Sequence, residues 1–142
     1  MLAATGRIGI IVAMLCAAAW GCGTGSAKAP GGGAQVRTAF SGGLPEMEGD
    51  RLRTTVLEVT YEPGGASTPH RHPCPVVGYV VQGNLRTQVQ GGGVAVYRAG
   101  ETFFEAPNVV HLVSANAGDD QPARFLAIFT CDRETPLSVP QP

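Results

Sequence analysis

The chain from Gln35 onward is predicted to fold as an all-β domain, a sandwich-like barrel of the jelly-roll type. Its apolar residues occur in short runs bounded by Gly, Pro and Asn, and no run keeps the period of an amphipathic helix. Gly83-Asn84 and the glycines at 91–93 have the composition of hairpin turns. Short strands joined by small turns suit a jelly roll, although turn glycines alone would suit any all-β fold.

β-Branched and aromatic residues place the expected strands between these turns. In residues 55–61, Thr, Leu, Val and Tyr alternate with Val, Glu and Thr, so this strand should present two different faces. Residues 132–142 contain few apolar side chains and are expected to run along the surface. The expected strands are residues 36–40, 52–61, 76–82, 85–90, 94–98, 102–105, 109–114 and 124–130.

Length and charge limit the possible functions. A chain of 142 residues with a formal net charge of −1 suits a single domain. It contains no cluster of Lys and Arg, so no nucleic acid partner is expected. Since the overall charge indicates no particular class of partner, the function is expected to depend on a local site.

The histidines are the residues most indicative of such a site. His70 and His72 are separated by one residue, and in an extended backbone their rings would project from one face, about 6–7 Å apart. His111 lies far along the chain, and a sheet that folds back would bring it to the same ion. Three imidazoles would hold a metal and leave positions open for water or substrate. The pair alone is equally compatible with a chance surface arrangement.

The spacing around these histidines resembles the two motifs of the cupin family of small β-barrels. The first motif, G(X)5HXH(X)3-4E(X)6G, is met at Gly64, His70, His72 and Gly83. Its glutamate is missing, because Val76 occupies that position.

The second motif, G(X)5PXG(X)2H(X)3N, is met at Gly100 and His111. Ala106 takes the place of its proline, and its asparagine falls one residue late, at Asn116. Asn108 replaces its glycine, a mild change because Asn tolerates the left-handed backbone conformation.

The resemblance implies a double-stranded β-helix, the jelly-roll cupin barrel, in residues 35–142. It also implies that His70, His72 and His111 bind one divalent metal ion. Three nitrogen ligands do not distinguish Fe(II), Zn, Mn, Ni and Cu. Cupins commonly pair through their sheets, so a homodimer is expected.

Glu105 is the expected catalytic carboxylate, because it lies six residues before His111 at the end of a strand. In some of the three-histidine cupin dioxygenases that this chain resembles, a glutamate at this spacing lies just outside the metal ligands. Since Val76 cannot ligate, Glu105 would act as a hydrogen-bond partner, a general base or a replacement ligand. A solvent-facing glutamate at a strand end is equally compatible with the sequence.

Two classes of function remain open. The first is an Fe(II)-dependent, dioxygenase-like enzyme acting on a small oxygenated substrate, as the resemblance implies. The second is a non-catalytic periplasmic module that binds or senses a small ligand. Oxygen-dependent turnover with added Fe(II) would separate the two classes.

Residues 1–22 are predicted to be a lipoprotein-type signal peptide. Arg7 precedes an apolar run at 8–20, shorter than the roughly 20 residues of a membrane-spanning helix. Gly21-Cys22 resembles the junction at which the cysteine becomes lipidated, and residues 23–34 would form a flexible tether. The expected location is therefore exported, as a membrane-anchored lipoprotein or in the periplasm. Cleavage near residues 27–29 and an uncleaved anchor are the alternatives.

Cys74 has two possible roles. It stands two residues after His72 and would add a thiolate ligand if the strand continued, but Pro73 and Pro75 break that register. In an exported chain, Cys74 and Cys131 would instead be able to form a disulfide. The sequence does not decide whether they are close.

Overall fold

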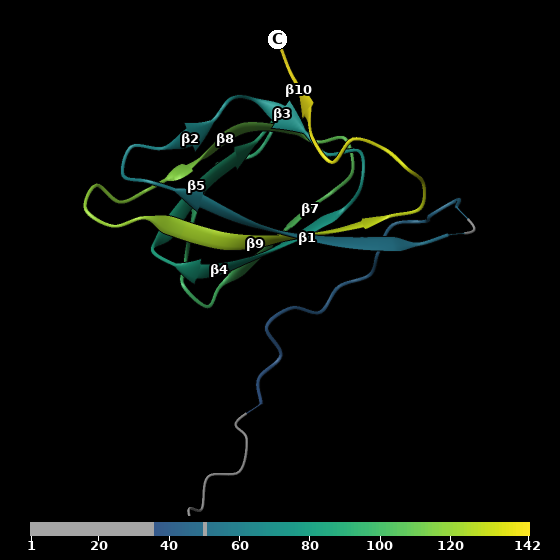
Figure 1. Ribbon diagram of the computed structural model, residues 1–142, viewed down its shortest axis with the longest axis horizontal. Coiled ribbons are helices and arrows are strands. Elements are labelled where there is room, and N and C mark those ends of the chain that lie inside the picture. Colours follow the sequence, from purple (N-terminus) through teal and green to yellow (C-terminus); the bar gives the residue numbers. More distant parts are fainter. Residues whose placement is uncertain (1–35, 50) are drawn as a thin grey trace, which may run out of the picture. The chain divides into compact units, whose positions relative to one another are not determined.

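The computed structural model describes residues 36–49 and 51–142, and these residues form two facing antiparallel sheets (Figure 1). The expected all-β jelly-roll fold is confirmed. The predicted signal peptide and tether lie outside the described residues. Within the described ranges, no helix is long and apolar enough to span a bilayer.

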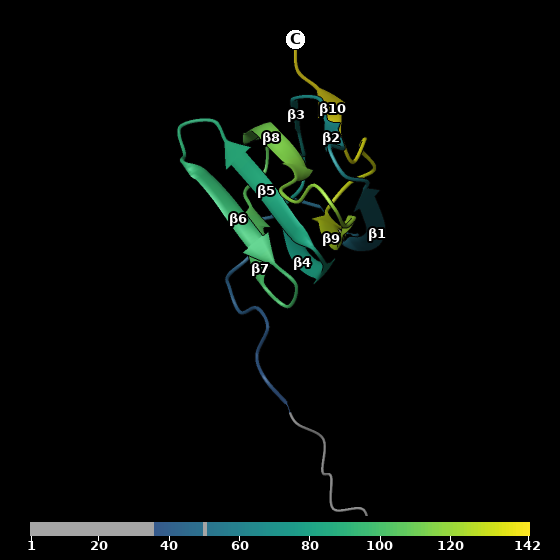
Figure 2. The same cartoon turned by 90° about the vertical axis from the view of Figure 1, so that its left-hand side faces the viewer.

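The strands divide between the sheets as a jelly roll requires, with neighbours in space that are distant in sequence. Figure 2 shows β5 and β6 on one side of the domain and β1, β9 and β4 on the other. The first sheet has the order β1 (Arg53–Tyr61), β9 (Ala123–Cys131), β4 (Val76–Gln82), β7 (Thr102–Glu105). The second has the order β10 (Val139–Pro140), β3 (His70–Arg71), β8 (Val110–Asn116), β5 (Asn84–Val89), β6 (Val94–Arg98), with β2 (Ala66–Ser67) also paired to β8.

The core lies between the sheets because alternate side chains point inward. In β9 every second residue is buried, from Ala123 to Cys131. Val80 and Leu85 are fully buried, which contributes about 1.5–3 kcal/mol per side chain. Gly78 faces the ring of Phe103 so closely that a Cβ there would overlap the ring. The absence of a side chain at position 78 therefore makes room for the ring of Phe103, its partner in the neighbouring strand of the same sheet.

The strand predicted at residues 36–40 is wrong. This segment has no strand pairing and is attached by side chains: Arg37 Nη2 donates to Gly100 O at 2.7 Å, and Thr102 Oγ1 donates to Ala39 O at 2.8 Å. Val36 remains 91% exposed. Its apolar residues resemble those of a strand, but no backbone ladder forms beside them.

The C-terminal tail also differs from its prediction. Leu137 packs against the core, and β10 pairs with β3 instead of lying free on the surface. The tail is short of apolar residues, but backbone pairing does not require them. It becomes the outermost strand of the second sheet.

β8 contains a bulge that explains the late asparagine of the second motif. Gln88 pairs with Val113 while Val89 pairs with His111, so β8 has one more residue than β5 here. Asn116 therefore lies one position later than the motif places it. It is buried, and its Nδ2 donates to Tyr61 O at 3.1 Å.

Cys74 and Cys131 form a disulfide, with their Cα atoms 5.2 Å apart and both residues buried. This resolves the two roles left open by the sequence, because a disulfide sulfur is not a thiolate ligand. The bond joins the turn that follows His72 to the end of β9.

We expect this disulfide to stabilise the domain substantially, because it closes a loop between residues 57 positions apart. Cys74→Ala combined with Cys131→Ala should lower the free energy of unfolding by about 2–4 kcal/mol in denaturant titration. A reductant should lower the stability of the unmodified chain and leave the double variant unchanged. Equal stability of the oxidised and reduced chains would contradict the expectation.

Candidate metal centre

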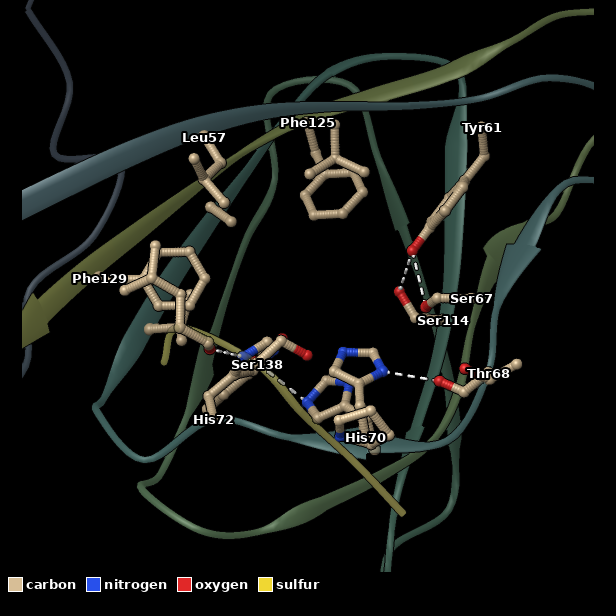
Figure 3. A pocket seen from close by; sticks show the side chains of 17 residues that line it. Leu57, Tyr61, Ser67, Thr68, His70, His72, Ser114, Phe125, Phe129 and Ser138 are labelled. Carbon is tan, nitrogen blue, oxygen red and sulfur yellow. Dashed lines mark hydrogen bonds and ion pairs between the residues drawn. The ribbon is translucent and has the colours of Figure 1, made fainter. Parts of the chain in front are cut away.

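A cavity of about 250 Å³ between the two sheets is lined by all three histidines and Glu105 (Figure 3). Side chains from β1, β4, β7 and β9 form one wall, and β2, β3, β8 and β10 form the other. β8 pairs with β3 in the second sheet, and this pairing places His111 directly opposite His70. The ring centroids of the three histidines lie 4.8, 5.4 and 5.7 Å apart.

Backbone carbonyls orient two of the rings. His70 Nδ1 lies 2.8 Å from Thr68 O, and His72 Nδ1 lies 2.6 Å from Leu137 O. A carbonyl only accepts, so each Nδ1 carries the proton and each Nε2 is left with a free lone pair. This is the arrangement that metal-ligating histidines adopt, with the other ring nitrogen held by a carbonyl or carboxylate.

Asn108 holds the segment that carries this pair. It has the left-handed φ of 64° that was expected where it replaces the motif glycine. Its N–H donates to His72 O at 2.6 Å, and its Oδ1 accepts from Arg71 Nη1 at 2.6 Å. Arg71 is therefore engaged beside the histidine pair and does not line the cavity. A glycine would supply the conformation but lacks the side-chain acceptor.

Glu105 lies beside Val76, the residue that stands where the first motif has its glutamate. Val76 and Glu105 are direct partners between β4 and β7, and such inward-facing partners lie about 4.5–5.5 Å apart at Cβ. Glu105 is 7% exposed, and its Oε2 lies 3.0 Å from His111 Nε2 and 3.4 Å from His72 Nε2. The solvent-facing alternative for Glu105 is therefore wrong.

Several polar atoms of the site are buried without a hydrogen-bond partner. Glu105 Oε2 and both ring nitrogens of His111 are buried without a hydrogen-bond partner, since the 3.0 Å approach lacks hydrogen-bond geometry. Burial lowers the pKa of His72, and the neighbouring His70 and His111 lower it further, against the raising effects of Leu137 O and Glu105. The His72 ring is therefore neutral at pH 7. A buried carboxyl oxygen without a hydrogen-bond partner is costly, and a cation beside it would offset that cost.

The kinds of donor atom at the site, and their distances from Glu105, are compatible with a divalent metal ion. Metal–ligand bonds of about 2.0–2.2 Å place adjacent ligand atoms roughly 3 Å apart, close to the 3.0 and 3.4 Å contacts of Glu105. Among the described residues, however, no group of three or more His, Cys, Asp or Glu side chains is already arranged as a metal site. Neither ring nitrogen of His111 has a hydrogen-bond partner, so no hydrogen bond would compete with a metal for these atoms.

Two groups at the site had no signal in the sequence analysis. One is the carbonyl of Leu137, since a backbone acceptor has no side-chain signature. The other is a hydroxyl cluster formed by Tyr61, Ser67 and Ser114 on the cavity wall. The two serines each stand three residues from a histidine, a spacing that an unbroken strand would place on opposite faces.

A cupin-domain family model matches residues 57–129, which are 73 of the 142 residues. The chain belongs to the cupin family. No curated protein matches it. This cupin domain accounts for both histidine motifs and for the two-sheet fold.

Solved structures of other cupins resemble this chain. An oxalate oxidase in complex with the substrate analogue glycolate shares 29% identity at a TM-score of 0.52, over 61% of this chain and 45% of the oxidase. Oxalate decarboxylase from Bacillus subtilis, which has Mn(II) centres, shares 26% identity at a TM-score of 0.51, over 68% of this chain and 29% of the decarboxylase. A DMSP lyase from Ruegeria pomeroyi shares 19% identity at a TM-score of 0.55, over 62% of this chain and 43% of the lyase, and shows the fold alone.

The matched segments span less than half the length of each of these three chains. The likeness to the oxalate oxidase and the decarboxylase supports a divalent metal and a small-molecule ligand in general. The particular metal and ligand have to be argued from the residues of this cupin.

The tail should control metal affinity through His72. Ending the chain after Pro136 removes Leu137 O and β10, so His72 loses the acceptor that fixes its proton on Nδ1. We expect Co(II) to bind about 10–100-fold more weakly, as measured by spectroscopic titration. Ending the chain after Pro140 retains both features and should bind Co(II) normally. Equal affinities for a folded long and short truncation would contradict this role.

Proposed function

We propose that this cupin is a metal-dependent enzyme acting on a small oxygenated molecule, with Fe(II)-dependent, dioxygenase-like chemistry as the reaction class. His70, His72 and His111 hold the ion, and Glu105 is the carboxylate of the site. The observation that carries the proposal is the buried Glu105 Oε2, which lacks a hydrogen-bond partner and stands within 3.4 Å of two imidazole nitrogens. A divalent cation would satisfy all of these atoms at once.

In such a site the histidines would bind the metal and Glu105 would transfer protons. A bound divalent metal would polarise a substrate oxygen and, as Fe(II), supply electrons for dioxygen chemistry. Glu105 Oε2 would accept a proton from the substrate or from a water beside it, since it has no other partner. Phe125 and Phe129 on the opposite wall would exclude bulk water from the reacting atoms (Figure 3).

The role of the ligands can be tested by replacing them. His70→Ala, His72→Ala and His111→Ala should each cut the metal content of purified protein sharply, because three ligands are the fewest such a site uses. Glu105→Gln should retain most of the metal and lose turnover if the carboxylate transfers a proton, whereas a ligating Glu105 would lose the metal instead. Elemental analysis beside oxygen consumption with added Fe(II) separates these results.

Two outcomes would remove the proposal or change its class. Unchanged metal content in all three histidine variants would show that the motif is vestigial. Metal and ligand binding without turnover would instead favour the non-catalytic binding module. A Glu105→Gln variant with normal metal content and normal turnover would exclude that residue from the chemistry.

We further propose that the chain is exported and anchored to a membrane through Cys22. The disulfide between Cys74 and Cys131 supports this location, because such bonds persist in oxidising compartments. On the outer face of the first sheet, Val56 is 54% exposed on the edge strand β1, and Phe104 on the opposite edge strand β7 stacks on Phe40. A homodimer through this face stays a prediction, which sedimentation analysis would test.

The anchor makes a specific covalent prediction. Intact-mass analysis of the chain from a bacterial membrane fraction should show diacylglycerol on Cys22 at the mature terminus. Cys22→Ser should abolish the lipid adduct and release the protein from the membrane. A mature terminus at any residue after Cys22 would exclude lipidation at Cys22.

A further inference from the structure

The cavity contains a second polar group besides the metal centre. Tyr61 Oη lies 2.9 Å from Ser67 Oγ and 3.1 Å from Ser114 Oγ, and Figure 3 shows the three hydroxyls together on the cavity wall. Tyr61 belongs to β1 in the first sheet, whereas the serines belong to β2 and β8 in the second. The cluster therefore closes the cavity where the sheets approach each other.

The cluster has hydrogen-bonding capacity that it does not use. Three hydroxyls offer three donors, and two hydrogen bonds between them consume two of these. No other hydrogen bond in the described part of the chain involves these hydroxyls. One O–H donor is therefore left without a partner in the cluster. The hydroxyls are part-buried on the cavity wall, so a water or a ligand acceptor in the cavity can satisfy this donor.

The backbone places this cluster as a second row parallel to the histidines. Ser67 in β2 pairs with Ser114 in β8, and His70 in β3 pairs with His111, also in β8. The bulge in β8 and the break between β2 and β3 allow residues three positions apart to face the same cavity. Three residues of extended chain separate the rows by about 10 Å along the strand.

The rest of the cavity wall is mostly apolar and carries no positive side chain. Leu57, Val59 and Phe125 line it, Thr68 and Ser138 add two further hydroxyl residues, and none of the described lining residues is Lys or Arg. A carboxylate placed at the hydroxyl end would lose its hydration without gaining a cation, which is costly. A neutral acceptor oxygen loses far less and gains the free hydroxyl donor.

We propose that Tyr61, Ser67 and Ser114 form a neutral recognition site that determines the substrate class of the metal centre. The ligand has an oxygen-chelating head for the ion, a short apolar body, and an uncharged acceptor oxygen such as an ether or carbonyl at its other end. This inference rests on the proposed metal-dependent function. Oxalate, with two adjacent carboxylates and no apolar body, does not match the cavity.

Three hydroxamates with the same six-atom backbone test the proposal, because a hydroxamate head chelates many divalent and trivalent metals. Hexanohydroxamate ends in an alkyl chain, 4-methoxybutanohydroxamate replaces one methylene with an ether oxygen, and adipic acid monohydroxamate ends in a carboxylate. Calorimetry on the metal-loaded full chain should show the ether probe binding about 5–10-fold more tightly than the alkyl probe, as expected for one hydrogen bond. The carboxylate probe should bind most weakly.

Oxygen-deletion variants assign that preference to the cluster. Tyr61→Phe, Ser67→Ala and Ser114→Ala together remove three oxygen atoms and no carbon, so the ether and alkyl probes should then bind about equally. Tyr79→Phe is the matched control, since Tyr79 lies on β4 outside the cavity and should keep the full preference. If the triple variant does not fold, the comparison uses Tyr61→Phe alone. The preference of the unmodified chain for the ether probe should then be weaker in Tyr61→Phe.

The outcomes separate this inference from the function on which it rests. Metal-dependent binding of all probes with equal affinity, or tightest binding of the carboxylate probe, would overturn the neutral site and leave the metal function intact. An ether preference that persists without the three hydroxyls would overturn their assignment. Probes that bind equally with and without metal would overturn the proposed function itself.

Discussion

The site depends on the pairing of β3 with β8, because this pairing places His70 opposite His111. β3 is only two residues long and would be unstable as an isolated ribbon. It is retained because β10 pairs along its other side and Asn108 binds the residue that follows it. The disulfide fixes the turn after His72 to the end of β9. Contacts from distant parts of the sequence therefore hold the three imidazoles.

The carboxylate of this site lies on a different strand from the one that carries the glutamate in the family motif. β4 carries an aliphatic residue, Val76, where the family motif has glutamate, and its partner in β7 is Glu105. Both side chains point into the same cavity. The carboxylate that β4 lacks is thus supplied by the neighbouring strand, and its oxygen reaches two of the histidines. The imidazole nitrogens therefore have one carboxyl group as a neighbour.

Most of the fold was predictable because the strands that carry the core have strong local patterns, such as the alternation in 55–61 and the glycines at 91–93, which turn the chain between the paired strands β5 and β6. The hairpin predicted at Gly83-Asn84 is wrong, because β4 and β5 belong to different sheets and do not pair. The histidine spacing also predicted which side chains would meet. The segment 36–40 was misread because its apolar residues resemble a strand, whereas its attachment runs through Arg37 and Thr102. The tail was underestimated for the opposite reason: its contribution is a carbonyl and a backbone pairing, which leave no pattern in side-chain chemistry.

The disulfide also constrains the chemistry open to the metal. Cys74 is two residues from His72 and would be the nearest soft ligand, but its bond to Cys131 removes the thiolate. The remaining donors near the centre are imidazole nitrogens and one carboxylate, a set that suits Fe, Mn, Ni, Cu and Zn without the strong bias toward Zn and Cu(I) that thiolates create. By removing the thiolate, the Cys74–Cys131 bond leaves a set of donors that does not disfavour redox-active metals. Selection among them then falls to geometry and metal supply rather than to ligand softness.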